Sequence, residues 1–346
     1  MRRMEIGGKT GRCEILVGEP ISRLAEYCKA EKAAIITDGS VRKLHGSSFP
    51  DYPVIEIGRG EAEKTLATVE GIYRRFMEFG LDRQSVVVGI GGGIVCDVAG
   101  FAAATYLRGV RFGFVPTTLV AMTDAAVGGK NGVNFEGYKN LIGTIRQPDF
   151  VLCDFGLLST LPPLEIRCGF AETIKHAAIA DAQLFAYLEG HLGEAMALKK
   201  SVIEKVMHDS LSVKAVIVSA DESESGERRK LNFGHTFGHA LERMLGMPHG
   251  EAVSAGMCID ARISVKKGMC AKEDAERLVA LLEKAGLPTE VPAKAKGRAK
   301  EMMDAIRKDK KRKSEAVGMA LLEGIGKAKV CEVKMAELEA VANDLC

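Results

Sequence analysis

Three histidines, His235, His239 and His249, occur within fifteen residues of this chain. On a helix, His235 and His239 would project from one face, one turn apart, because they are four positions apart. Residue 236 is threonine, so the segment is not the HExxH motif of metalloproteases. Glu172 offers a carboxylate. Two imidazoles and one carboxylate, with a fourth position open to substrate, are typical of catalytic zinc. The spacing leaves open which histidines bind the ion, and ordinary structural histidines are the alternative.

A run of three glycines, Gly91–Gly93, separates a predicted buried strand at 85–90 from a predicted helix at 94–105. Glycines let the backbone approach a ligand closely, and the helix N-terminus offers N–H groups to phosphate. The run is not a GxGxxG motif, so a tight strand-to-helix turn is the alternative. Asp97 could contact a ligand or interact with the helix dipole. Asp38 ends an earlier strand, where it could bind a ribose hydroxyl or form an Asx turn.

The stretch from 106 to 140 is dense in polar residues and glycine, and we expect a long functional loop there rather than a merely solvated one. Its lysines and arginine favour an anionic, phosphorylated substrate. The candidate residues in this stretch are Arg108, Thr117, Thr118, Asp124, Lys130, Asn134, Lys139 and Asn140. Further basic residues are Lys214, Arg228, Lys230 and the charge run at 308–313, for which a solvated helix end is the alternative.

Two kinds of pattern must position these residues. Up to about residue 155, short apolar runs alternate with amphipathic stretches, which predicts a parallel sheet with helices on both faces. After Pro162-Pro163, long helical patterns dominate. The predicted strands are 33–37, 85–90, 112–115, 150–154, 316–322 and 328–333, and the predicted helices are 61–80, 94–105, 164–190, 193–219, 235–246, 250–267 and 272–285, with a loop at 288–300. We therefore expect an α/β domain at 1–155 and an α-helical domain at 156–346.

Composition excludes several classes of protein. The 346 residues include 48 Lys and Arg against 46 Asp and Glu, a net charge of +2 that argues against a broad nucleic-acid surface. Tryptophan is absent, so a base-stacking platform is not expected. Nine cysteines without a CxxC pair predict a reducing compartment, and no apolar run suits a signal peptide or membrane span. We expect a cytoplasmic enzyme or binding protein without membrane or nucleic-acid partners.

Several long motifs, in order along the chain, closely resemble those of the 3-dehydroquinate synthase family. They are the segments 91–109, 115–119, 124–130, 139–143, 232–240 and 249–253. The resemblance extends from about residue 37 to about residue 313. It implies a nucleotide-binding α/β domain followed by an α-helical metal-binding domain, with the active site in a cleft, a bound NAD, a divalent zinc or cobalt ion, and a homodimer.

The resemblance also implies roles for individual residues. Metal ligands would be Glu172, His235 and His249, and His239 would handle a proton near the substrate. NAD contacts would be Asp38, Glu61, Lys64, Gly92, Gly93, Ile94, Asp97, Thr117, Thr118, Lys130, Lys139, Leu157 and Thr160. Substrate contacts would be Arg108, Asp124, Lys130, Asn140, Lys175, Lys214, Arg228 and Asn232, with Glu224 as an acid or base and either Lys310 or Lys311 on the phosphate.

The implied reaction converts 3-deoxy-D-arabino-heptulosonate 7-phosphate to 3-dehydroquinate and phosphate, the second step of the shikimate pathway. Transient oxidation by NAD, phosphate elimination, re-reduction and an intramolecular aldol closure follow one another. Another sugar-phosphate cyclase is the nearest alternative, but the substrates of cyclases that make an inosose or a valiolone lack the carboxylate that Arg228 and Asn232 would meet. A metal-dependent polyol dehydrogenase is a more distant alternative, and an NAD-binding sensor is more distant still.

Overall fold

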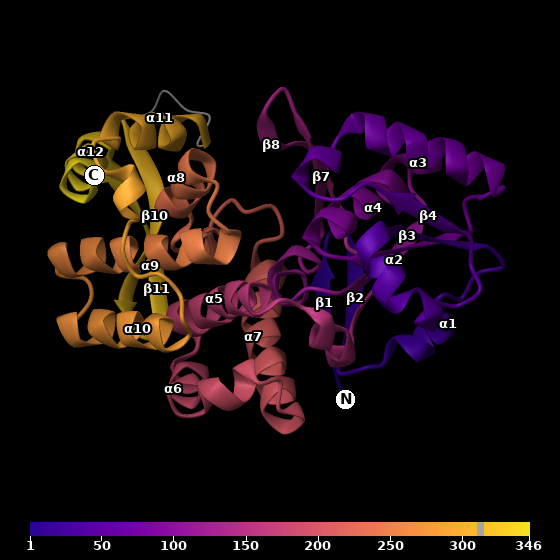
Figure 1. Cartoon of the computed structure of the whole chain (residues 1–346), viewed down its shortest axis with the longest axis horizontal. Helices are drawn as coiled ribbons and strands as arrows, with labels where there is room; N and C mark the ends of the chain where they lie inside the picture. Colours follow the sequence, from indigo (N-terminus) through magenta and orange to yellow (C-terminus); the bar gives the residue numbers. More distant parts are fainter. Residues whose placement is uncertain (310–314) are drawn as a thin grey trace. The chain divides into compact units, whose positions relative to one another are not determined.

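The computed structural model describes residues 1–309 and 315–346, and these form two compact units (Figure 1). The first unit comprises Met1–Ile166 together with Lys214–Ser223. The second comprises Arg167–Val213 together with Glu224–Cys346. The chain therefore passes between the units three times. The predicted domain boundary between residues 155 and 156 stays a prediction.

A seven-stranded sheet forms the centre of the first unit, in the order β1-β2-β9-β6-β5-β3-β4. Every neighbouring pair is parallel except β1 and β2, an antiparallel hairpin at one edge. The strands are β1 (Arg2–Gly8), β2 (Gly11–Val17), β3 (Ala33–Asp38), β4 (Val54–Ile57), β5 (Val86–Gly91), β6 (Arg111–Pro116) and β9 (Phe150–Cys153). The predicted parallel sheet is thus present, and the hairpin at one edge and β4 at the other are additions that the sequence analysis did not predict.

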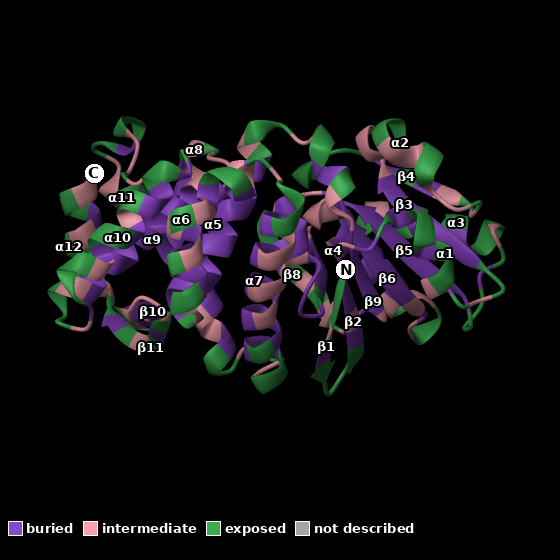
Figure 2. Cartoon of the chain, turned by 90° about the horizontal axis from the view of Figure 1, so that it is seen from below, coloured by how far each residue is buried: buried purple, intermediate pink, exposed green. Residues whose placement is uncertain are grey.

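Helices cover both faces of this sheet. Val88 and Ile90 of β5 share a buried cluster with Leu24 of α1. Gly89, which lies between them, points to the opposite face, where a Cβ atom would lie 3.0 Å from that of Ala99 in α4. The helices of the unit are α1 (Leu24–Tyr27), α2 (Gly39–His45), α3 (Leu66–Glu78) and α4 (Gly93–Thr105). Both faces of the central strands are consequently buried, as their colour in Figure 2 shows.

The prediction of a long loop at 106–140 is wrong over much of this segment. Besides β6 it contains β7 (Lys130–Phe135), which pairs with β8 (Tyr138–Ile145) as an antiparallel hairpin. Glu136 and Gly137 connect the strands with φ values of 49° and 74°. Positive φ at both central residues is the geometry of a tight hairpin turn, normally signalled by Asn-Gly or Asp-Gly. Glu-Gly gave a weaker signal, and the largely exposed β8 shows no regular alternation of apolar and polar residues.

The second unit is mainly helical around a small antiparallel sheet. Buried residues of β10 and β11 pack against α8, α9, α11 and α12 (Figure 1). Its elements are α5 (Pro163–Ala180), α6 (Ala182–Met196), α7 (Lys200–Ala220), α8 (His235–Leu245), α9 (His249–Lys266), α10 (Lys272–Lys284), α11 (Ala299–Asp309), β10 (Ala316–Gly324), β11 (Lys327–Lys334) and α12 (Met335–Leu345). The first residues of α5 and the last turns of α7 belong to the first unit. No helix within 1–309 and 315–346 is both long and apolar enough to cross a bilayer.

Two expected helices, 164–190 and 193–219, are divided differently in the structure. Asp181 interrupts the first because its carboxylate accepts hydrogen bonds from the backbone N–H groups of Gln183 and Leu184, at 3.0 and 2.9 Å. Such an N-cap ends α5 and begins α6. Leu198, with φ at 56°, separates α6 from α7. The periodicity continued through both breaks, so apolar spacing alone did not locate them.

Candidate active site

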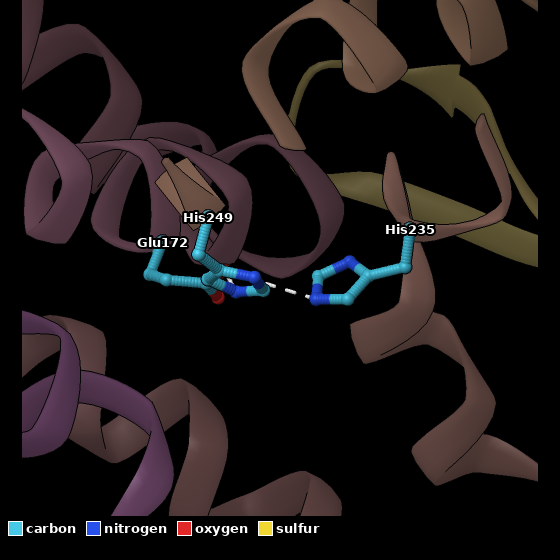
Figure 3. A group of neighbouring side chains, drawn as sticks. All are labelled: Glu172, His235 and His249. Carbon is cyan, nitrogen blue, oxygen red and sulfur yellow. Dashed lines mark ion pairs between the residues drawn. The ribbon is translucent and has the colours of Figure 1, made fainter. Parts of the chain in front are cut away.

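One carboxylate and two imidazoles converge in the second unit. Glu172 projects from α5, His235 is the first residue of α8, and His249 is the first residue of α9. One potential ligand atom from each lies within 4.8 Å of the other two (Figure 3). The Oε1 atom of Glu172 lies 3.3 Å from Nε2 of His249 and 3.8 Å from Nε2 of His235. The three donors fit a divalent ion with a coordination position left for substrate.

Close helix packing brings the two histidines together. Gly234, directly before His235, has a φ of 80° and donates its N–H to the buried carboxylate of Asp260 in α9, at 2.7 Å. A Cβ atom on Gly256 of α9 would lie only 1.9 Å from the carbonyl oxygen of Gly234. The start of α8 therefore lies directly on α9, and no side chain separates them.

A second glycine contact brings the start of α9 against α5. A Cβ atom on Gly250, the residue after His249, would lie 2.3 Å from Cα of Cys168. Cys168 lies about one helical turn before Glu172 on α5. Because Gly250 has no side chain and the backbone of Cys168 lies against it, the distance between His249 and Glu172 is set by helix packing and not by flexible side chains alone.

Each histidine uses its Nδ1 atom for a hydrogen bond outside the cluster. The Nδ1 atom of His235 lies 3.0 Å from the carbonyl oxygen of Phe233, which can only accept, so Nδ1 carries the proton. The Nδ1 atom of His249 lies 3.3 Å from Oε2 of Glu242. In both rings Nε2 is the atom that faces Glu172. This arrangement, with Nδ1 satisfied and Nε2 directed inward, is the one that metal-binding histidines normally adopt.

The two histidines have opposite electrostatic environments. Burial, aided by the charge of Lys175, lowers the pKa of His235 well below its usual 6.5. Burial also lowers the pKa of His249, but hydrogen bonds and charge from Glu172 and Glu242 outweigh it and raise the pKa to about 10. His235 is therefore neutral at neutral pH. The ring of His249 is instead protonated on both nitrogens and lies between two carboxylates. A metal ion bound by both histidines would have to displace one of these protons.

Lys175 completes the buried charge of this cluster. It lies one turn after Glu172 on α5, and its ammonium group forms an ion pair with the Glu172 carboxylate. Both side chains are almost fully buried, with exposed fractions of 1% and 0%. Buried charges persist in proteins when they are paired or bound to metals. Lys175 and the protonated His249 are thus both cationic neighbours of Glu172, even without a metal ion.

His239 lies beside the Glu172 group but is not part of it. Its ring centroid is 5.1 Å from that of His235 and 6.3 Å from that of His249. It joins Glu242 and His249 in a second group whose potential ligand atoms also lie within 4.8 Å. The spacing left open which histidines could bind an ion. The structure brings these histidines into two candidate groups, Glu172 with His235 and His249, and Glu242 with His239 and His249.

Three further predicted residues of the second unit, Glu224, Arg228 and Asn232, precede α8 in the sequence. Asn232 donates its side-chain N–H to Oε1 of Glu224 at 2.6 Å, and Glu224 has a strained φ of 61°. Arg228 and Asn232 belong to the short helix η7 (Glu227–Asn232), and Arg228 is buried. The predicted phosphate contact, Lys310 or Lys311, lies outside the described residues.

In the first unit, the glycine run occupies the predicted position between β5 and α4. Gly92 is the N-cap of α4, and the backbone N–H of Thr117 donates to the carbonyl of Gly91 at 2.9 Å. A Cβ atom on Gly91 would lie 2.6 Å from Val95, and one on Gly93 would lie 2.9 Å from the Cβ of Ala125. The turn is tight enough to require glycine, and it leaves the N-terminus of α4 without a side-chain cap.

Two ion pairs flank this turn within the first unit. The ammonium group of Lys64 lies 2.5 Å from Oδ2 of Asp97, and both side chains are mostly buried. Burial raises the pKa of Asp97 above its usual 3.8, against the opposing charge of Lys64. Lys214 of α7 donates to both the carboxylate and the backbone carbonyl of Asp124. Glu61 accepts from the side chain of Asn134 at 2.7 Å, which joins this region to β7.

The other predicted residues of this unit lie on turns and on the β7–β8 hairpin. Arg108, with a φ of 69°, follows Leu107 at 49°, two strained residues in succession. Asn140 also has a positive φ, and its backbone N–H donates to the side chain of Asn134. Asp38 caps α2 by accepting from two backbone N–H groups, which is the Asx geometry left open earlier. Lys130 and Lys139 lie on the hairpin, Thr118 caps the turn after β6, Ile94 lies in the first turn of α4, and Leu157 and Thr160 lie in η6 (Phe155–Thr160).

Two charged residues that contact these groups, Glu242 and Asp260, were not predicted, and neither was Glu222, which accepts hydrogen bonds from Lys9 and Thr10. Glu242 could have been found, because it lies three residues after His239 and seven after His235, on the same helix face. Asp260 and Glu222 gave no such signal. Their partners, Gly234 and the Lys9–Thr10 turn, are distant in sequence.

Solved structures with this fold include sugar-phosphate cyclases and, at 16% and 18% identity, a probable glycerol dehydrogenase and an iron-containing alcohol dehydrogenase. A 2-deoxy-scyllo-inosose synthase complexed with carbaglucose-6-phosphate, NAD+ and Co2+ matches with a TM-score of 0.87 and 26% identity, covering all of both chains. The 2-epi-5-epi-valiolone synthase of Streptomyces hygroscopicus subsp. jinggangensis, with NAD+ and Zn2+ bound, matches at 0.86 and 28%, covering 100% of this chain and 99% of that one. The chain thus has a sugar-phosphate cyclase fold.

Sequence comparisons identify the family within this fold. The models of the 3-dehydroquinate synthase N-terminal and C-terminal regions match residues 54–168 and 169–312. The 3-dehydroquinate synthase of Halorhodospira halophila is 42% identical over 314 residues, 89% of this chain and 88% of that protein. That of Pelobacter propionicus is 38% identical over 96% of this chain and 89% of its own length. The chain belongs to the 3-dehydroquinate synthase family. The family, fold class and enzyme class predicted from the sequence are confirmed.

Proposed function

We propose that this chain converts 3-deoxy-D-arabino-heptulosonate 7-phosphate to 3-dehydroquinate and inorganic phosphate. The observation that carries the proposal is the convergence of Glu172, His235 and His249 in a chain of this family. Solved relatives contain NAD+ with Co2+ or Zn2+, which supports the same two cofactors here.

The residues of the second unit would hold the metal and the substrate around it. A zinc or cobalt ion bound by Glu172, His235 and His249 supplies Lewis acidity that lowers the pKa of substrate hydroxyls. Lys175 neutralises Glu172 and offers an ammonium N–H to an anionic oxygen. Glu224, oriented by Asn232, and the neighbouring His239 are the groups proposed to exchange protons with the substrate.

The residues of the first unit would hold the dinucleotide. Bound NAD supplies a temporary hydride acceptor, so the overall reaction involves no net oxidation. The unpaired N–H groups at the start of α4 suit its pyrophosphate. The further contacts proposed for it are Asp38, Glu61, Lys64, Gly92, Gly93, Ile94, Asp97, Thr117, Thr118, Lys130, Lys139, Leu157 and Thr160.

Several cations suit a substrate that carries both a phosphate and a carboxylate. Arg228 is buried and planar, which favours paired hydrogen bonds to a carboxylate. Lys214 is buried against Asp124, which fixes the position of its ammonium group. The other proposed substrate contacts are Arg108, Lys130, Asn140, Asn232 and one of Lys310 and Lys311.

A phosphate-release assay with the heptulosonate phosphate tests the proposal. We expect stoichiometric phosphate, a product with the mass of 3-dehydroquinate, and no accumulation of NADH. Persistent NADH accumulation would instead indicate a polyol dehydrogenase, and no phosphate release would count against any cyclase activity.

A second candidate function is that of another sugar-phosphate cyclase. It is favoured by the structural match to the inosose and valiolone synthases. The same assay, with a sugar phosphate that lacks the carboxylate, separates the two functions. We expect Arg228→Ala to raise KM for the carboxylated substrate, since that side chain is proposed to bind the carboxylate. We also propose a homodimer, which light scattering on the eluting protein would test.

A further inference from the structure

We propose that Glu242 is a positioning residue for the metal centre: it accepts a hydrogen bond from Nδ1 of His249 and thereby holds Nε2 of that ring toward Glu172. This inference rests on the proposed function, because it concerns the same metal ligands. It assigns Glu242 no contact with substrate or cofactor.

The geometry places the His249 ring between two carboxylates. Nδ1 lies 3.3 Å from Oε2 of Glu242, and Nε2 lies 3.3 Å from Oε1 of Glu172. Of the three proposed ligands, His249 is the most exposed, at 31% of its side chain against 9% for His235 and 0% for Glu172. Surrounding atoms therefore restrict this ring least, and its orientation depends most on its hydrogen-bond partner.

The turn between α8 and α9 explains how Glu242 reaches this ring. Gly246 ends α8 in the left-handed conformation, with φ at 65°, and its N–H donates to the carbonyl of Glu242 at 3.0 Å. His249 begins α9 three residues later. The last turn of one helix therefore faces the first residue of the next, and the Glu242 side chain needs only to cross this short connection.

The other ligand histidine achieves the same orientation without a carboxylate. His235 donates from Nδ1 to the carbonyl of Phe233, two residues earlier in its own chain. A backbone carbonyl is positioned by the chain itself, whereas the carboxylate of Glu242 can be removed by substitution. The metal centre thus has one replaceable outer partner and one that no side-chain substitution removes.

Glu242 could alternatively be a ligand, since it also forms a group with His239 and His249. An ion there would have to use Nδ1 of His249, and the proton would then lie on Nε2, facing Glu172. One imidazole cannot direct lone pairs to both sides while it keeps a proton. The Glu172 side has a fully buried carboxylate and a nearly buried His235 whose Nε2 atom faces that carboxylate, which favours the ion on that side.

The experiment measures the dissociation constant of Zn2+ for the metal-stripped full chain, by competition with a chelator. Glu242→Ala removes the acceptor and should weaken binding about 10- to 100-fold, the usual effect of losing an outer partner. Glu242→Gln keeps an acceptor oxygen at the same reach and should bind within a few-fold of the unchanged chain. Glu242→Asp keeps the charge but withdraws the carboxylate, and should resemble Glu242→Ala. Glu276→Ala, which alters an exposed pair with Lys272 in the same unit, is the matched control.

Each outcome separates this inference from the proposed function. Failure of the unchanged chain to bind Zn2+ would overturn the metal centre itself. Tight binding by Glu242→Ala, or a loss in Glu242→Gln as large as that in Glu242→Ala, would overturn the positioning role; the second result would indicate a direct ligand. The absorption spectrum of Co2+ should change in the Ala and Asp variants and stay the same in the Gln variant. Circular dichroism and melting temperature of each metal-free variant establish that it is folded.

Discussion

The two units hold their candidate functional groups in different ways. In the first, a backbone turn at Gly91–Gly93 exposes the start of α4, and the nearby charges include ion pairs such as Lys64 with Asp97. In the second, side chains from α5, α8 and α9 converge around the carboxylate of Glu172. A backbone site needs space and a tight turn, whereas a side-chain site needs its helices at fixed distances. The units should therefore fail separately and for different reasons.

Removing a proposed metal ligand should have the largest effect and leave the first unit intact. We expect His249→Ala to lose bound metal and to lower turnover by at least about 1000-fold, since metal catalysis supplies several kcal/mol of barrier lowering. NAD affinity should be unchanged. Metal analysis, phosphate release and NAD titration measure the three quantities. His191→Ala, on the outer helix α6, is the control. Full activity in His249→Ala would refute the ligand assignment.

Separating the helices should break the same site without touching a ligand. In Gly250→Ala the new methyl group would lie 2.3 Å from the backbone of Cys168, so α9 must move away from α5. We expect a loss of about 1–3 kcal/mol in the free energy of unfolding and weaker metal binding. Gly190→Ala has open space around its Cβ and should stabilise its helix by about 0.4–1 kcal/mol. Equal effects of the two changes in denaturant titrations would contradict the packing argument.

A change in the glycine turn should produce the converse pattern. Gly91→Ala places a methyl group 2.6 Å from Val95 and should displace the first turn of α4. We expect NAD affinity to fall about tenfold, the equivalent of a strain near 1.4 kcal/mol. The Zn2+ dissociation constant should not change. Both constants are measured on the same preparation by calorimetry, and loss of metal binding together with NAD binding would mean that the units do not fail separately.

The same difference decides what the sequence could predict. The glycine turn was found in full, because its three residues are adjacent and lie between a clear strand and helix. The proposed metal ligands were predicted as a set, but their spacing did not distinguish His239 from His235 and His249. That choice depends on which ring atoms face Glu172, and this follows from the packing of Gly234 and Gly250, which no local pattern encodes.

The fold was predictable where apolar periodicity is strong and unpredictable where a single polar contact intervenes. The central parallel strands β3, β5, β6 and β9 and helices such as α8 to α10 follow from buried runs and helical spacing. The hairpin at β7 and β8 was missed because β8 is largely exposed and its apolar residues do not alternate regularly with polar ones. The break between α5 and α6 was missed because it depends on the capping carboxylate of Asp181. Family resemblance supplied the proposed residue roles, which remain predictions and which neither pattern could give.

The smallest expected effect concerns Glu222 of the first unit. Its side chain accepts several hydrogen bonds, whereas the proposed cofactor site of the same unit is formed by backbone. Its carboxylate accepts from the backbone N–H of Lys9 at 2.9 Å, from Oγ1 of Thr10 at 2.5 Å and from Nε2 of Gln147 at 2.9 Å. Burial raises the pKa of Glu222, but the bonds from Thr10 and Gln147 outweigh it, and the pKa lies below its usual 4.5. A carboxyl with a depressed folded pKa stabilises the fold above its unfolded pKa and loses this contribution as pH falls through the folded value.

We therefore expect Glu222→Gln to lower the free energy of unfolding by about 1 kcal/mol near neutral pH, the net value of a hydrogen bond or two. The difference from the unchanged chain should shrink as the pH falls below about 4.5, because the carboxylate is then protonated in both states. Denaturant titrations at several pH values measure it, with Glu276→Gln as the exposed control. A difference independent of pH would assign the effect to shape and not to charge. Unchanged Zn2+ binding in this variant would show that Glu222 stabilises the first unit and does not affect the proposed metal ligands Glu172, His235 and His249.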